Sequence, residues 1–261
     1  MPIANLQNAK LHYKLEGPDR APVIVLSNSL GTDLEMWNGQ VPELSKYLRV
    51  LRYDTRGHGS SKADGDAWSL AHLGLDVLEL LNYLGIDRFH VCGISLGGMT
   101  ALWLAIHAPQ RVLSLMPCNT AARIGNEATW NARIKQVQEH GLASIADATM
   151  ERWFTASFRD RASAQVEATR QMLLRTDASA YLACCAALRD ADLTGAISSI
   201  SAPTLVISAT SDPVTPPSDG RLLQERIPGA VYREINAAHL SNIEDPASFL
   251  AATLQFVTGK Q

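Results

Sequence analysis

The sequence predicts an α/β fold with a mostly parallel sheet, helices on both faces and a helical lid insertion. Short, continuously apolar runs recur along the chain, as expected of strands that are buried on both faces of a sheet. Helix-like stretches separate these runs, and this alternation is typical of parallel sheets. The alternation stops between residues 121 and 193, where the pattern is helical, and then resumes.

The expected strands are rich in Val, Ile and Leu. They cover residues 22–27, 48–53, 89–94, 112–118 and 204–209, with a further strand-like stretch at 230–235. Residues 69–85 place leucines along one helical face and end at Gly85, a suitable C-terminal cap. A second helix is expected to end before Pro109, and a last one to begin near Pro246. We therefore expect a core formed by residues 1–120 and 194–261 and a lid formed by residues 121–193.

Composition and charge narrow the class of protein. The 261 residues are 46% hydrophobic and 19% charged, as in soluble globular proteins. A net charge of −3 without a Lys/Arg cluster argues against nucleic acid or a membrane surface as a partner. The first residues lack a signal-peptide pattern, and no apolar stretch reaches the roughly 18 residues of a membrane span, so we expect a cytoplasmic protein. The sequence indicates no particular oligomeric state.

Cofactor motifs are missing from the sequence. No cluster of His, Cys and carboxylate residues has the spacing of metal ligands, and the phosphate-binding motif G-x-x-x-x-G-K-[ST] does not occur. We therefore expect neither a metal nor an organic cofactor.

The candidate nucleophile is Ser95, in the stretch GISLG at residues 93–97. This matches the G-x-S-x-G pattern, in which a sharp turn between a strand and a helix exposes a serine hydroxyl. Here an apolar run precedes the turn and a helix-like stretch follows it. The N-terminus of that helix would favour the negative charge that develops during attack.

A serine hydroxyl needs a base, and the base needs an acid that orients it. His239 follows the last strand-like stretch, whereas His140 lies in the lid insertion, so His239 is the expected base. Asp212 follows the apolar run at 204–209 and is the expected acid, in the chain order Ser, Asp, His. Asp219 is the nearby alternative, on the helix expected next.

Backbone N–H groups are expected to stabilise the oxyanion. One is that of Leu96, directly after the nucleophile. The other comes from the loop after an early strand, VLSNSLGTD. The Gly-rich stretch YDTRGHGSS at residues 53–61 is expected to be scaffolding, with Asp54 and Arg56 holding loops together.

These residues, in this order, resemble the α/β-hydrolase superfamily over nearly the whole chain. Within it, the combination of LSNSLGTDLEMW, RYDTRGHGSS, CNTAARIG and AAHLSNIE is similar to the 3-oxoadipate enol-lactonase family. Many hydrolases have a His-Gly pair where Asn28 and Ser29 stand in this sequence, and this comparison places the second oxyanion donor at Leu30. The resemblance implies an α/β-hydrolase fold and the hydrolysis of a small, carboxylate-bearing enol-lactone in the catabolism of aromatic compounds, without a cofactor.

An anionic lactone substrate requires a cationic partner for its carboxylate. Trp130 and Arg133 lie three residues apart in the lid insertion, on one face if the stretch is helical. We therefore expect this pair to bind the substrate.

Other activities share the same catalytic residues. A carboxylesterase, a perhydrolase or a hydrolase of carbon–carbon bonds would use the same triad. A ligand receptor on the hydrolase fold, which turns over slowly, is the alternative outside enzymes, and a measured rate distinguishes it.

Overall fold

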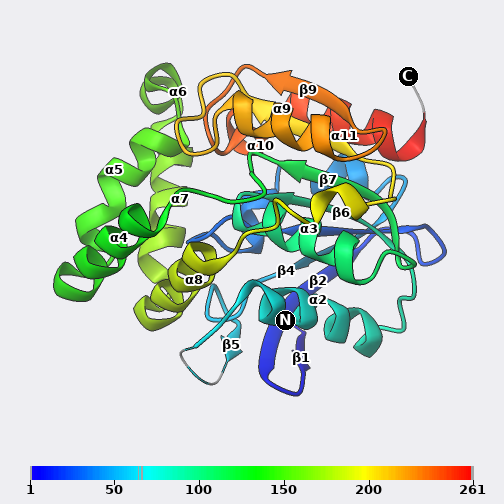
Figure 1. The fold of residues 1–261 in the computed structure, drawn as a ribbon, viewed down its shortest axis with the longest axis horizontal. Helices are drawn as coiled ribbons and strands as arrows, with labels where there is room; N and C mark the ends of the chain where they lie inside the picture. The colour runs from blue at the N-terminus through cyan, green and yellow to red at the C-terminus, as the bar shows by residue number, and fades with distance from the viewer. Residues whose placement is uncertain (1, 64, 66, 260–261) are drawn as a thin grey trace.

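The computed structural model describes residues 2–63, 65 and 67–259. Within them, nine strands form one sheet in the order β1-β2-β4-β3-β6-β7-β8-β9, with β5 paired to β2 (Figure 1). The strands are β1 (Ile3–Asn5), β2 (Ala9–Glu16), β3 (Val23–Ser27), β4 (Arg49–Tyr53), β5 (Lys62–Ala63), β6 (Phe89–Ile94), β7 (Val112–Cys118), β8 (Leu205–Ala209) and β9 (Val231–Ile235).

The sheet is parallel from β4 to β9 and antiparallel at one edge. Strands β3, β4, β6, β7, β8 and β9 pair in parallel with their neighbours, whereas β2 pairs antiparallel with β1, β4 and β5. The six strands predicted from apolar runs are confirmed, each within one residue of its expected start and end. The antiparallel edge was not predicted, because β2 alternates buried and polar residues and lacks a continuous apolar run.

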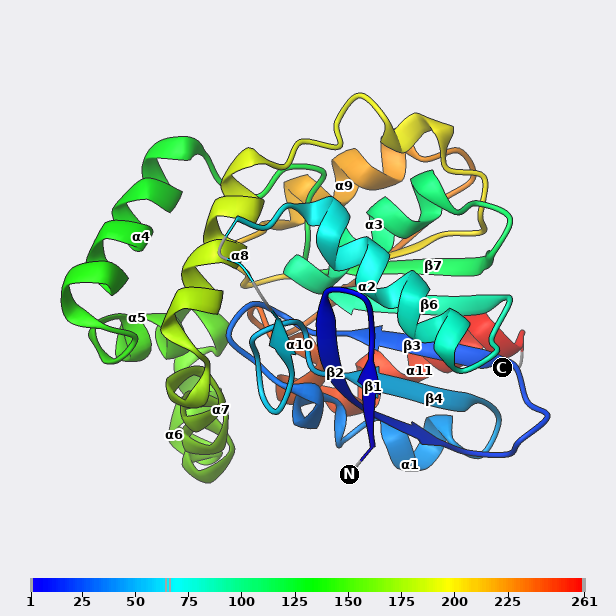
Figure 2. The ribbon, with the colours of Figure 1, turned by 90° about the horizontal axis from the view of Figure 1, so that it is seen from below.

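Helices cover both faces of the sheet. Figure 2 shows α2 (Leu70–Tyr83), α3 (Leu96–His107) and α9 (Pro217–Arg226) on one face, and α1 (Val41–Leu44) and α11 (Pro246–Thr258) on the other. Helix α10 (Ser241–Glu244) and the short 3-10 helices η1 (Leu34–Trp37) and η2 (Ile197–Ser199) complete this part. The expected α/β layers are therefore confirmed.

A group of helices follows β7 and precedes β8 in the chain, and it projects to one side of the sheet (Figure 1). It comprises α4 (Glu127–His140), α5 (Ala143–Trp153), α6 (Ala156–Arg161), α7 (Ser163–Arg175) and α8 (Ala178–Asp190). All five fall inside residues 121–193, the segment expected to form the lid. The exact division into lid and core remains a prediction.

In the core, apolar strands pack against helix α3, which is almost entirely buried. Every residue of β3 and β8 is buried, as are the first ten residues of α3, which packs on β6 and β7. All four cysteines are buried and free of disulfides. Across the described residues, none of the helices has the length and apolar character needed to cross a membrane.

Candidate active site

Ser95 occupies a strained turn between β6 and α3. Its φ of 57° and ψ of −115° are unusual for a residue with a side chain. Two close approaches hold the turn: a Cβ on Gly93 would lie 2.1 Å from the carbonyl oxygen of Gly97, and one on Gly97 would lie 2.1 Å from that of Ser27. The glycines around Ser95 therefore let three backbone segments meet, and this geometry presents the serine at the end of β6.

His239 and Asp212 lie beside Ser95 at the carboxyl ends of parallel strands. His239 follows β9 and Asp212 follows β8, and both side chains are buried. His239 Nδ1 lies 2.8 Å from Asp212 Oδ2. Asp219, in the first turn of α9, forms no such bond in the described structure. In the structure, therefore, Asp212 rather than Asp219 is hydrogen-bonded to His239.

Asp212 accepts a dense set of hydrogen bonds. Besides His239, Oδ2 accepts from Asn119 Nδ2 at 3.0 Å and Thr215 Oγ1 at 2.8 Å, while Oδ1 accepts from the N–H groups of Val214 and Thr215. Burial alone would raise the pKa of Asp212, but the charge of His239 and these hydrogen bonds hold it below its usual value. Asp212 is thus an anion that fixes a proton on His239 Nδ1. Neither Asn119 nor Thr215 was predicted to contact Asp212.

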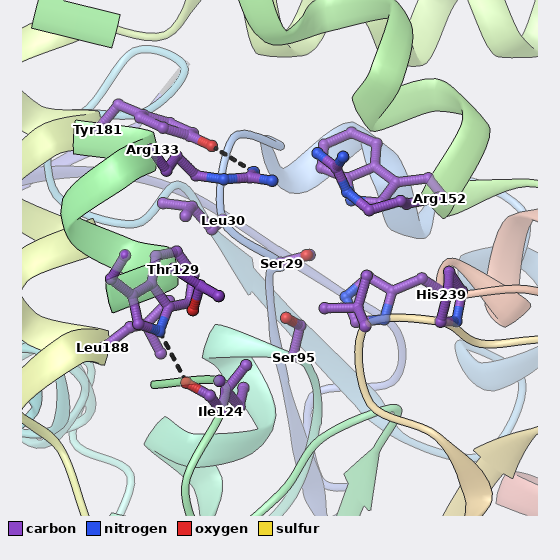
Figure 3. A pocket seen from close by; sticks show the side chains of 15 residues that line it. Ser29, Leu30, Ser95, Ile124, Thr129, Arg133, Arg152, Tyr181, Leu188 and His239 are labelled. Atoms are coloured by element: carbon purple, nitrogen blue, oxygen red, sulfur yellow. Dashed lines mark hydrogen bonds between the residues drawn. The ribbon is translucent and has the colours of Figure 1, made fainter. Parts of the chain in front are cut away.

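Ser95, His239 and residues of α4, α5 and α8 line one cavity of about 340 Å³. In Figure 3 the Ser95 hydroxyl and the His239 ring face this space. Ser95 Oγ forms no hydrogen bond to another described residue, and proton transfer to His239 requires the two groups to approach when substrate binds. Nowhere in the described residues do three or more His, Cys, Asp or Glu side chains form a group that could hold a metal ion.

In the loop after β3, the N–H groups on either side of Leu30 are engaged. The N–H of Ser29 donates to Met36 Sδ, that of Gly31 to His58 Nε2 and that of Thr32 to the Ser29 carbonyl. The Leu30 N–H between them has no acceptor in the described structure, and neither does the Leu96 N–H at the start of α3. Leu30 lines the cavity, and Leu96 directly follows Ser95 at the start of α3. These two free donors are where the sequence predicts the oxyanion hole, an assignment that remains a prediction.

The loop at residues 53–61 is held by buried polar contacts. Asp54 accepts hydrogen bonds from His12 Nδ1, the Leu34 N–H and the Ser60 N–H, and so joins β2, η1 and its own loop. Arg56 donates two hydrogen bonds to Asp76 on α2, at 2.6 and 2.7 Å, and both side chains are buried. The expected scaffolding role of Asp54 and Arg56 agrees with these contacts.

His58 holds the loop after β3 as a neutral imidazole. Its Nε2 accepts from the Gly31 N–H at 3.0 Å, and its Nδ1 lies 3.1 Å from the Arg56 carbonyl, so the proton is on Nδ1. Burial lowers the pKa of His58 below its usual 6.5. Protonation of Nε2 would remove the acceptor for Gly31.

We expect the protein to lose stability as the pH falls below about 6.5, because unfolded His58 then binds a proton that the folded state rejects. The unfolding temperature, measured between about pH 5.5 and 7.5, should depend less on pH in His58→Gln than in the unmodified protein. His140 is exposed, so His140→Gln should keep the original pH dependence. Equal slopes for all three proteins would contradict the role given to His58.

The two residues predicted to bind substrate both lie at the cavity. Trp130 and Arg133 stand on α4, and the Trp130 ring is fixed by a hydrogen bond from Nε1 to the Ile124 carbonyl at 2.7 Å. Arg133 Nη1 donates to Tyr181 Oη at 3.2 Å, and burial raises the pKa of Tyr181 to about 12, so the phenol stays neutral. The Arg133 guanidinium thus keeps its full positive charge beside the cavity.

A second arginine, Arg152 on α5, was not predicted. Figure 3 shows Arg133 and Arg152 extending toward each other across the space above Ser95. Arg152 donates to Thr149 Oγ1 at 3.0 Å, and burial together with the charge of Arg133 lowers its pKa. In the described structure neither guanidinium pairs with a carboxylate, and no Asp or Glu lines the cavity. Two unneutralised cations therefore face the same cavity as Ser95.

Comparison with known proteins agrees with this architecture. A family model described as alpha/beta hydrolase fold matches residues 22–246. The chain is 44% identical to 3-oxoadipate enol-lactonase 1 of Acinetobacter baylyi, covering 99% of this chain and 97% of the relative. It is 41% identical to 3-oxoadipate enol-lactonase 2 of the same organism, covering 93% and 91%.

A solved structure gives the same result. The enol-lactonase from Burkholderia xenovorans LB400 superposes with a TM-score of 0.97 at 43% identity, covering 98% of this chain and 100% of that one. These matches confirm the resemblance predicted from the sequence motifs, to the α/β hydrolases and, within them, to the 3-oxoadipate enol-lactonases. The chain therefore belongs to the α/β-hydrolase fold family.

Proposed function

We propose that this protein is a serine hydrolase that opens 3-oxoadipate enol-lactone, a small cyclic enol ester with a carboxylate, to 3-oxoadipate. One observation carries the proposal: Arg133 and Arg152 line the same cavity as Ser95 and His239, and no carboxylate of the described residues pairs with either arginine. Two cations in a partly apolar cavity favour an anionic ligand. The similarity to two enol-lactonases over nearly the full chain supports the same substrate class.

Acylation begins with attack of Ser95 Oγ on the lactone carbonyl carbon, while His239 Nε2 accepts the hydroxyl proton. The N–H groups of Leu30 and Leu96 donate to the oxyanion. The ring C–O bond then breaks, and His239 returns the proton to the departing enol, which tautomerises to the ketone. Because the leaving group is an enol, this step is easier than expulsion of an amine.

Deacylation uses the same groups. His239 Nε2 accepts a proton from a water molecule that attacks the Ser95 ester, and the oxyanion again lies at Leu30 and Leu96. Collapse of the intermediate releases the second carboxylate and returns the proton to Ser95. Asp212 remains ionised and stabilises the His239 imidazolium formed in each half-reaction.

A direct ultraviolet assay tests the proposal. Purified protein is mixed with 3-oxoadipate enol-lactone, with neutral enol-lactones of the same ring size, and with simple carboxylic esters, and the loss of enol-ester absorbance is followed. We expect kcat/KM to be highest for the carboxylate-bearing lactone. Preference for a simple ester would favour a carboxylesterase, and a single turnover with tight binding would favour a receptor.

Removing either arginine should weaken binding of the charged lactone selectively. We expect Arg133→Ala, and independently Arg152→Ala, to raise KM for this lactone by the equivalent of about 1.5–3 kcal/mol, the range for a hydrogen bond to a charged group. Neutral lactones should lose little. Some binding energy from this remote contact is used for orientation, so a fall in kcat for the charged lactone is compatible.

Lys135 provides the matched control, because it is a cation on the same helix with an exposed side chain. Lys135→Ala should leave KM unchanged for both lactones. Equal losses for charged and neutral lactones in Arg133→Ala would show instead that the variant disturbs the helices around the cavity. No loss in either arginine variant would remove the carboxylate-binding role.

A further inference from the structure

Glu244, at the end of α10, is a buried carboxylate that the proposed mechanism does not use. Its Oε2 accepts hydrogen bonds from the Ala238 N–H at 3.0 Å and the Thr155 N–H at 3.2 Å, and the Thr155 hydroxyl donates to Oε1. Among the described residues, no Lys, Arg or His pairs with it. Burying an ionised carboxylate costs free energy unless hydrogen bonds replace its hydration, and here they come from just two residues.

These two donors belong to distant segments of the chain. Ala238 directly precedes His239, whereas Thr155 follows α5 in the group of helices beside the sheet. A second hydrogen bond joins the same segments, because the Leu240 N–H donates to the Trp153 carbonyl at 3.1 Å. Both chain neighbours of His239 are therefore attached to the segment 153–155, on one side through the Glu244 carboxylate.

The segment 153–155, to which the His239 loop is attached, continues from the wall of the cavity. Arg152 and Trp153 line the cavity, and Thr155 caps α6 by accepting from the Phe158 N–H at 3.3 Å. A shift of this segment would move the backbone on both sides of His239. Conversely, a fixed segment holds the backbone that carries the His239 imidazole.

We infer that Glu244 is a positioning residue: it holds the cavity wall at 152–155 to the loop of His239, so that His239 Nε2 stays in line with Ser95 and Arg152. This inference rests on the proposed serine-hydrolase function. A purely structural anchor would differ in one respect, because its loss would lower the stability of the fold and leave the turnover of the folded enzyme unchanged.

Glu244→Gln tests the inference with little change in volume. Oε2 alone accepts from both segments, so an NH₂ group in its place loses the bonds from the Ala238 and Thr155 N–H groups. In the other orientation the NH₂ group meets the Thr155 hydroxyl, which already accepts from the Phe158 N–H, so the connection is weakened in either case. We expect kcat to fall about 10- to 100-fold for the enol-lactone and for 4-nitrophenyl acetate alike, since small displacements of catalytic groups have effects of this size. KM for the lactone should change far less than kcat.

Thr155 provides the partner variants. Thr155→Val removes the hydroxyl donor without touching a triad residue and should lower kcat in the same direction, whereas Thr155→Ser should restore it. If the two side chains act as one connection, the double variant Thr155→Val with Glu244→Gln should have about the kcat of Glu244→Gln alone. If Glu244→Gln does not fold, the comparison of Thr155→Val with Thr155→Ser is sufficient to test the inference.

Asp76 is the matched control, because it is an equally buried carboxylate, paired with Arg56 and remote from the His239 loop in its contacts. Asp76→Asn should lower the unfolding temperature but not the kcat of the folded protein. Two results would overturn the inference while leaving Ser95-dependent hydrolysis in place. One is an unchanged kcat in folded Glu244→Gln. The other is a double variant whose fold-loss in kcat equals the product of the losses of the two single variants. Absence of Ser95-dependent hydrolysis of both substrates in the unmodified protein would overturn the proposed function itself.

Discussion

Ser95→Ala should abolish nearly all turnover of the enol-lactone, lowering kcat by at least about three orders of magnitude. Without Oγ no acyl-enzyme can form, and the cavity retains only the oxyanion donors and the binding contacts. The fold should survive, because Ser95 Oγ forms no hydrogen bond to a described residue and the backbone contacts of the turn do not involve the side chain. Steady-state kinetics on protein with an unchanged unfolding temperature provides the measurement.

Ser29 is the matched control for this variant, since its side chain also lines the cavity. Figure 3 shows both serine hydroxyls near the same space. Ser29→Ala can remove at most a hydrogen bond to substrate, so kcat should fall by about tenfold at most. The reverse ranking would transfer the nucleophile to Ser29 and contradict the mechanism.

The second large effect is expected for Asp212→Asn, which should lower kcat by about four orders of magnitude. The N–H groups of Val214 and Thr215 both donate to Oδ1 and would hold the amide oxygen of an asparagine there. Its NH₂ group would then face His239 Nδ1, which would have to accept rather than donate. The proton would move to Nε2, and the imidazole could no longer act as a base toward Ser95.

Asp219→Asn tests whether this effect is specific to the position. Asp219 is half-buried, and burial together with the charge of Asp212 raises its pKa, but it does not contact His239. Its variant should keep nearly the original kcat. A larger loss in Asp219→Asn than in Asp212→Asn would show that the acid of the triad is Asp219.

Much of the central sheet could be predicted because its signals are local. Strands buried on both faces carry continuous apolar runs, and β3 and β8 are entirely buried. Ser95 was found for a similar reason: the strained turn requires glycines at fixed distances from it, and these are visible in five residues. His239 and Asp212 followed from chain order and from their positions after expected strands.

The antiparallel edge escaped prediction because its signals are weak. Strand β2 has exposed and half-buried positions along its length, and β1 and β5 are three and two residues long. Strand β2 alternates apolar and polar residues instead of forming a continuous apolar run, and β1 and β5 are too short to show either pattern. Their location depends on β4, whose partner β2 lies about 35 residues earlier in the chain.

The sequence by itself determined the order of the core strands along the chain, the turn at Ser95 and the residues available to act with it. Only the tertiary structure decided that Arg152 faces Arg133, that Asn119 and Thr215 hold Asp212, and that Glu244 joins Thr155 to Ala238. The physical reason is the range of the interactions. An apolar run or a glycine turn reflects constraints among near neighbours, whereas these contacts arise when segments distant in the chain pack together.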